Sequence, residues 1–256
     1  MIGKSSPTLK SPEEIRIMDE ANAIVWNILE KVASAVAPGI STQELDQLAE
    51  RECLAAGAVP TFKGYGGYPK SICISLNDVI VHGIPSPRVV IKSGDVVSID
   101  FGVTWLGFCG DAALTVAVGN VPPNALNLIR VTRECLDRAV EQCRPGQRVG
   151  DIGHAVQTHA EKHGLAVVRD FVGHGIGRSM HEPPQVPNYG SPGEGPALEP
   201  GMVLAIEPMI CEGSYRVTVD EDGWTARTAD GALAAHFEYS VAVTAAGPRV
   251  LGAGSR

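Results

Sequence analysis

The sequence predicts an α/β protein built from two half-domains of like structure, as three observations indicate. Amphipathic helical patterns precede β-rich segments, and landmarks of the first half recur in the second half at a constant offset. The 256 residues are 44% hydrophobic, which is enough to bury a large core and excludes a disordered or fibrous protein. We therefore expect one domain over residues 1–256, with repeats at about 11–118 and 119–250.

Two helices are expected to open the first repeat. Residues 11–14 combine a serine N-cap, a first-turn proline and a capping-box glutamate, and apolar residues follow at helical spacing as far as Val32. Ser41 and Glu44 begin a second helix with the same pattern, and Gly57 is a typical stop signal. Two helices should therefore precede the first strands.

Residues 71–118 are expected to form strands and hairpins, because they are rich in β-branched and apolar residues broken by Gly, Asn and Pro. If a hairpin turns symmetrically about Trp105 and Leu106, Asp100 lies directly opposite Asp111. Carboxylates placed in that way repel each other unless a cation lies between them.

The internal repeat is the most informative pattern in the chain. Three landmarks recur 107 positions later: Pro38-Gly39 at Pro145-Gly146, Gly57 at Gly164, and the run from Gly94 to Asp100 at Gly201 to Glu207. The repeat gives Asp100 and Glu207 equivalent positions in apolar strands. If the halves pack about a pseudo-twofold axis, these two acids lie near the centre.

Composition and charge restrict the partners and the compartment. The formal net charge is −8 and there is no long basic run, so we expect no nucleic-acid partner. The six cysteines include no CxxC pair, which predicts reduced thiols. The N-terminal segment lacks a signal-peptide core, and no run of about eighteen apolar residues is present. We therefore expect a cytoplasmic protein without a membrane partner.

Four acids interrupt apolar, β-rich segments: Asp100, Asp111, Glu207 and Glu238. Each of them alone is compatible with a salt bridge or an edge strand. An unpaired buried carboxylate is costly, however, and these segments contain too few basic residues to neutralise four of them. Divalent cations would balance the charge.

His174 is the fifth candidate ligand, within the glycine-rich segment 172–177, where the glycines would let the backbone approach a site. The segment lacks the spacing of a nucleotide-binding loop. Four carboxylates balance two divalent ions, and oxygen-rich ligation with one imidazole suits Mn, Fe, Co or Zn. Two ions sharing carboxylates produce a hydroxide nucleophile at neutral pH, so hydrolysis is the expected chemistry.

Five short motifs together resemble the methionine aminopeptidase family in order and spacing. They are VHGIP at 81–85, DFG at 100–102, GHGIG with MHEPPQVPN at 173–188, IEPM at 206–209 and HFE at 236–238. The resemblance covers nearly the whole chain. It implies the pita-bread (creatinase/aminopeptidase) fold, with two pseudo-twofold-related halves around a central antiparallel sheet, in the form typical of bacterial type I enzymes.

The resemblance also implies the roles of individual residues. Asp100 corresponds to a ligand of the first metal, Asp111 and Glu238 to bridging ligands, and His174 and Glu207 to ligands of the second metal. Glu207 is also the expected proton carrier. His181 would hydrogen-bond the scissile carbonyl, and His82 would contact the amide nitrogen that follows the first residue.

A methionine side chain would enter a pocket with aromatic and polarizable walls. The residues that the resemblance implies for its wall are Tyr65, Tyr68, Cys73, Met180 and Trp224. The chain departs from the usual family residues at four positions: Phe62, Gly66, Met180 and Tyr239. None of these changes removes an expected ligand, and Phe62 is expected to narrow the entrance.

The family implies removal of N-terminal methionine from peptides and nascent proteins, preferentially before a small second residue, with two divalent ions (Co, Mn, Fe or Zn). It further implies a monomer and a transient ribosome contact. Two alternatives remain open at this point: a proline-specific peptidase of the same fold, and a catalytically inactive relative that acts as a binding module.

Overall fold

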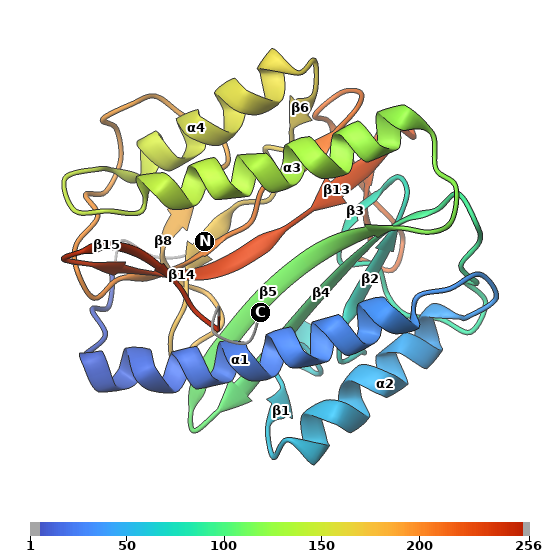
Figure 1. The fold of residues 1–256 in the computed structure, drawn as a ribbon, viewed down its shortest axis with the longest axis horizontal. Helices are drawn as coiled ribbons and strands as arrows, with labels where there is room; N and C mark the ends of the chain where they lie inside the picture. The colour runs from blue at the N-terminus through green and yellow to red at the C-terminus, as the bar shows by residue number, and fades with distance from the viewer. Residues whose placement is uncertain (1–5, 253–256) are drawn as a thin grey trace.

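The computed structural model describes residues 6–252, in which four α-helices form two consecutive pairs (Figure 1). They are α1 Pro12–Ala35, α2 Thr42–Ala55, α3 Pro123–Gln142 and α4 Val149–Lys162, and a 3₁₀ turn, η1, spans Tyr65–Gly67. Capping boxes at Ser11 and Ser41 confirm the two predicted helix starts. Gly57 follows the end of α2 with φ of 75°, a backbone conformation that stops a helix.

A nine-stranded sheet forms the centre of the described chain. Its strand order is β1-β4-β5-β14-β9-β7-β8, with β2 beside β4 and β15 beside β14, and all of these pairs are antiparallel. The strands are β1 Val59–Pro60, β2 Cys73–Leu76, β4 Val96–Trp105, β5 Phe108–Ala117, β7 Gly173–Gly175, β8 Glu182–Val186, β9 Val203–Ile206, β14 Glu238–Thr244 and β15 Gly247–Val250.

Two small antiparallel sheets flank the large one. The first consists of β6 Ala166–Val167, β10 Met209–Cys211 and β13 Ala234–His236, and the second of β3 Val79–Val81, β11 Val217–Val219 and β12 Ala226–Thr228.

The helices cover one face of the central sheet. Figure 1 shows α1 and α3 running across the sheet, with α2 and α4 on their outer sides. Ile99 and Phe101 of β4 are buried in one core cluster with Val25 and Leu29 of α1. Because successive side chains of a strand point to opposite faces, Asp100 must face away from the helices. The helices therefore leave the other face of the sheet free for a site.

The structure supports the duplication that the sequence predicts. Helix α4 begins and ends 107 positions after α2, and β6 begins and ends 107 positions after β1. Gly39 and Gly146 both have positive φ, at 97° and 91°. The two isolated bridges, Ser41–Val90 and Arg148–Ala197, show the same offset. The limits of the halves, at about 11–118 and 119–250, stay a prediction.

The register of the β4–β5 hairpin differs from the prediction. Trp105 pairs with Phe108, and Asp111 lies opposite Gly102 rather than opposite Asp100. The cause is the turn, which is centred on Leu106 and Gly107, both with positive φ. Asp100 and Asp111 are therefore diagonal neighbours, and they still share a face of the sheet because the register shift is an even number of residues.

All six cysteines are buried, and they are free thiols, as the sequence predicts for the latter. None of the helices within residues 6–252 combines the length and the apolar character that crossing a lipid bilayer requires.

Candidate active site

Five neighbouring strands of the central sheet each supply one polar side chain to a single cavity. In sheet order they are β4, β5, β14, β9 and β7. Their contributions are Asp100, Asp111, Glu238, Glu207, which directly follows β9, and His174. The four acids are each next to an apolar residue that is buried in the core cluster with the helices, whereas His174 is flanked by glycines. The site is therefore fixed by backbone pairing across the whole sheet.

The distances place these groups in mutual contact. The Nε2 atom of His174 lies 3.5 Å from Oε1 of Glu207 and 4.0 Å from Oδ2 of Asp111. Ligand atoms of Asp111, His174 and Glu238 all lie within 4.8 Å of one another. Asp100 and Glu207 are not part of this group of three, although both line the same cavity.

The carboxyl groups destabilise one another's charged forms. Burial raises the pKa of Asp100 to about 7. For Asp111, Glu207 and Glu238 burial is again the largest cause, the neighbouring carboxylates add to it, and each pKa lies well above its ordinary value. The described residues place no lysine or arginine in the cavity wall. The cluster can therefore be balanced only by protons or by cations.

The orientation of the donors fits divalent metal ions. The Nδ1–H group of His174 donates to the carbonyl oxygen of Gly175 at 2.9 Å, which leaves Nε2 as a lone-pair donor facing the acids. Burial lowers the pKa of His174 to about 3, so the ring is neutral at pH 7. Oδ1 of Asp100, Oδ1 of Asp111 and Oε1 of Glu238 are buried without a hydrogen-bond partner. Such unpaired oxygens are the preferred ligands of hard cations.

The cavity measures about 620 Å³ including its open mouth, and all twelve predicted site residues lie in its wall together with Phe62. The apolar part of the wall contains the five residues predicted for the methionine pocket: Tyr65, Tyr68, Cys73, Met180 and Trp224. Burial raises the pKa of the Cys73 thiol well above its ordinary value, so this residue is a neutral wall group rather than a nucleophile.

Two further imidazoles stand beside the acids. The ring of His181 lies 4.2 Å from that of His174, and its Nδ1 is 2.6 Å from the hydroxyl of Tyr65. Burial lowers the pKa of His82 to about 4 and also lowers the pKa of His181, so both rings are neutral at pH 7. His82 has a φ of 60°, a rare conformation for a residue other than glycine, and such strain is typical of functional positions.

His236 is a site neighbour that the sequence prediction missed. Its Nε2 is buried without a hydrogen bond and lies 3.8 Å from Oε2 of Glu207. Burial lowers its pKa to about 3. Its position two residues before Glu238 could have revealed it. Phe171 was also missed, and it packs edge-on against His82 with the ring centroids 5.3 Å apart.

The glycines around His174 are required for close packing of the backbone within the sheet, and they do not open the cavity. A Cβ atom on Gly173 would lie 2.4 Å from the carbonyl oxygen of Ala205, and one on Gly175 would lie 2.2 Å from that of Pro183. Both contacts are with neighbouring backbone segments. The expectation that these glycines admit backbone to the site is therefore corrected: they allow β7 to pack closely against its neighbours.

The four departures from the usual family residues fall into two groups. Phe62 and Met180 line the cavity, and a Cβ atom on Gly66 would lie 3.3 Å from the ring of Trp224, so these three shape the pocket. Tyr239 packs edge-on against Trp26 and accepts a hydrogen bond from Arg133, on the helix-covered face of the sheet. Its effect on the pocket can only be indirect.

We predict that Asp100→Asn stabilises the metal-free protein at neutral pH. Because the folded-state pKa of Asp100 is raised, the stability contributed by its protonated form is present at low pH and is lost as the pH rises to about 7. In excess chelator, the variant's gain in the free energy of unfolding should therefore grow by about 2 kcal/mol between pH 5 and pH 7. Urea denaturation measures this gain.

The exposed residue Asp137 provides the matched control, since Asp137→Asn makes the same chemical change outside the buried cluster. A gain for Asp100→Asn that is the same at both pH values would contradict the electrostatic description of the cluster.

The comparisons with known proteins agree with this geometry. Residues 16–245 match the model of metallopeptidase family M24. Methionine aminopeptidase 1 of Bacillus subtilis is 48% identical over 242 residues, which is 94% of this chain and 97% of the relative. The crystal structure of methionine aminopeptidase from Thermotoga maritima has a TM-score of 0.95 and 44% identity, and the match covers 96% of this chain and 99% of that one.

A proline-specific relative is more distant. The Xaa-Pro dipeptidase from Bacillus anthracis has a TM-score of 0.75 and 25% identity, and the match covers 95% of this chain but only 61% of the dipeptidase. The shared fold is the pita-bread fold that the sequence predicts. On the combined evidence of the sheet, the buried donor cluster and these similarities, the chain belongs to the methionine aminopeptidases of metallopeptidase family M24.

Proposed function

We propose that this chain hydrolyses the first peptide bond of proteins and peptides that begin with methionine. The observation that carries the proposal is the position of the donor cluster beside an apolar pocket in one cavity. A methionine side chain in the pocket would bring the first carbonyl group toward the cluster. The relatives with the highest identity quoted above bear the same activity in their names.

The proposed ligands of two divalent ions are the five side chains of the cluster. Asp100 would hold the first ion, His174 and Glu207 the second, and Asp111 and Glu238 would be shared by both. Four carboxylates balance two dications, and the mixed oxygen and imidazole set suits Mn, Fe, Co or Zn. When bound, such ions lower the pKa of water and polarise a carbonyl group.

His181 is proposed to stabilise the negative charge that develops on the scissile carbonyl oxygen. Burial raises the pKa of the Tyr65 phenol, so its hydroxyl stays protonated and can donate to Nδ1 of His181. In that tautomer the proton of the neutral ring is on Nε2. His181 can then donate a hydrogen bond to an oxyanion without carrying a charge of its own.

Glu207 is proposed to carry the proton from the attacking water to the leaving amine. Burial and Asp100 raise the pKa of Glu207, which makes it a base able to hold that proton near neutral pH. His236 lies close to Oε2 of Glu207 and would help to fix the orientation of the Glu207 side chain. His82, packed edge-on against Phe171, is proposed to contact the amide nitrogen after the first residue.

We further propose that the protein acts in the cytoplasm as a monomer, on nascent chains, with a transient contact at the ribosome, so that it takes part in protein maturation. The acidic net charge supports a protein rather than a nucleic-acid substrate. The proposed preference for a small second residue is supported by Phe62, which occupies the cavity wall beside Met180.

The proposal predicts that purified protein loaded with Mn or Co cleaves Met-Ala-Ser and leaves Ala-Pro-Pro intact. The physical reason is that the pocket accepts an unbranched thioether. Release of the free amino acid, measured by chromatography, gives the ratio of kcat/KM for the two peptides. Preference for Ala-Pro-Pro would favour the proline-specific alternative, and no cleavage of either peptide would favour the inactive binding module.

We predict that Glu238→Ala abolishes most turnover while the fold survives. The substitution removes one shared ligand, and it also relieves charge repulsion in the metal-free cluster. Metal content per chain after dialysis should fall, and circular dichroism should remain that of the parent protein. Glu30→Ala, on the exposed side of α1, is the control. Parental activity in Glu238→Ala would contradict its role as a ligand.

For His181→Ala we predict a loss of about 10²–10³ in kcat with metal content retained, the usual effect of removing one oxyanion donor. Steady-state kinetics and metal analysis on the same preparation test this together. A rise in KM with unchanged kcat would show instead that His181 contributes only to substrate binding.

A further inference from the structure

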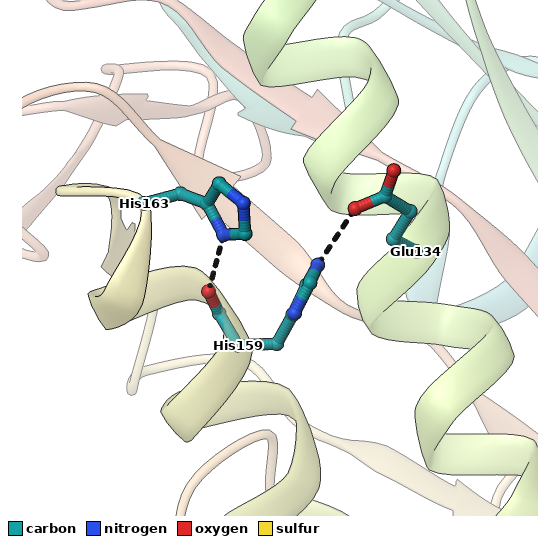
Figure 2. A group of neighbouring side chains, drawn as sticks. All are labelled: Glu134, His159 and His163. Atoms are coloured by element: carbon teal, nitrogen blue, oxygen red, sulfur yellow. Dashed lines mark hydrogen bonds and ion pairs between the residues drawn. The ribbon is translucent and has the colours of Figure 1, made fainter.

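A second group of metal-ligating side chains lies away from the cavity, where α3 faces α4. Glu134 of α3 and His159 and His163, which belong to α4 and its C-cap, are drawn in Figure 2. One ligand atom from each residue lies within 4.8 Å of the other two. None of the three lines the proposed active site.

The two histidines are arranged on one side of the helix. They are four residues apart, so they project from the same face of α4, and their ring centroids are 4.6 Å apart. Nδ1 of His163 lies 2.9 Å from the carbonyl oxygen of His159, which requires Nδ1 to carry the proton. In the neutral tautomer with this proton, Nε2 of His163 carries the lone pair, and a backbone partner of this kind is typical of metal-ligating histidines.

Glu134 supplies a charged oxygen to the same place. Its Oε2 lies 2.8 Å from Nε2 of His159, and its Oε1 accepts a hydrogen bond from Arg130 at 2.5 Å. These two partners, His159 first, hold the pKa of Glu134 below its ordinary value, so the group is a carboxylate at pH 7. The side chain of His159 is only 9% exposed, which limits competition from solvent.

The first half of the duplicated chain shows that the fold itself does not require these donors. The positions 107 residues earlier hold Asn27, Glu52 and Ala56. There, α1 and α2 are joined by an ion pair between Lys31 and Glu52 at 2.7 Å. A hydrogen bond between His159 and Glu134 would already hold the second pair of helices together, but it gives no reason for a second imidazole with a free lone pair beside it.

We propose that Glu134, His159 and His163 form a site for one Zn²⁺ ion, separate from the dinuclear centre, that links α3 to α4. Two imidazoles and one carboxylate form a ligand set that zinc accepts in tetrahedral geometry, with water in the fourth position. Hard cations such as Ca²⁺ and Mg²⁺ prefer oxygen ligands alone. The guanidinium of Arg130 reduces the net negative charge, so the affinity is moderate.

Binding requires a small and chemically balanced change. At zinc–ligand distances of about 2.1 Å, two ligand atoms of a tetrahedral site are about 3.4 Å apart. Nε2 of His159 and Oε2 of Glu134 must therefore separate from their 2.8 Å contact. In the zinc-bound tautomer of His159 the proton of Nε2 has passed to solvent, Nδ1 carries a proton taken from solvent, and the lone pair of Nε2 binds the ion.

The test locates zinc directly in the full-length protein. Crystals are grown with ZnCl₂, and anomalous scattering is measured on both sides of the zinc edge. We expect a peak between α3 and α4 in addition to those in the cavity. His163→Ala should remove this peak alone, whereas His154→Ala, an exposed histidine elsewhere on α4, should leave it in place.

Titration with ZnCl₂ against a chromophoric zinc indicator gives the affinity in solution. We expect His163→Ala to weaken one binding event by about tenfold or more while the tighter, cavity-bound zinc is unchanged. No anomalous peak between the helices, or identical titrations for His163→Ala and the parent protein, would overturn the proposal. Either result leaves the peptidase assignment untouched, because the cavity peaks and peptide cleavage are measured separately.

Discussion

Repulsion among four buried carboxyl groups is the constraint on which the rest of this structure depends. Each acid occupies its own strand or strand end, so none can move to solvent without breaking backbone pairing. The raised pKa values express this conflict in the metal-free protein. Proton uptake relieves it at low pH, and two dications would relieve it at neutral pH. The sheet thus holds its charges in a geometry that is unfavourable until a cation binds.

A small domain can tolerate this buried charge because the two faces of the sheet have different environments. The strands β4, β5, β9 and β14 also carry apolar residues that are buried in the core cluster with the helices. The loss of hydrophobic burial on the cavity face is therefore offset on the helix face. The neutral imidazoles follow from the same burial, because a desolvated ring beside other rings loses its proton.

The duplication and the five donors were predictable from patterns in the sequence, whereas the pocket wall was predictable only from the resemblance to a family. The constant offset of 107 was readable since positions such as Gly39 and Gly146 need a positive φ, which few other residues adopt. The hairpin register was wrong, because the position of a turn depends on which two residues take a left-handed conformation, and Leu106 is an unusual choice. His236 lies within the HFE motif at 236–238, but its role was missed because its contact with Glu207 forms only when the chain folds.

Both halves have two helices followed by strands, but the connections between their strands differ in length. In the first half β4 returns as β5 through a two-residue turn, whereas in the second half residues 207–237 separate β9 from β14. That longer connection contains β10 to β13, and it supplies Trp224 to the cavity wall and His236 beside Glu207, which a two-residue turn cannot do. Duplication therefore accounts for the paired positions of Asp100 and Glu207. The apolar pocket draws on both halves, with Tyr65, Tyr68 and Cys73 from the first and Met180 and Trp224 from the second. Trp224 lies in the connection that only the second half has, so the symmetry is broken on this side of the pocket.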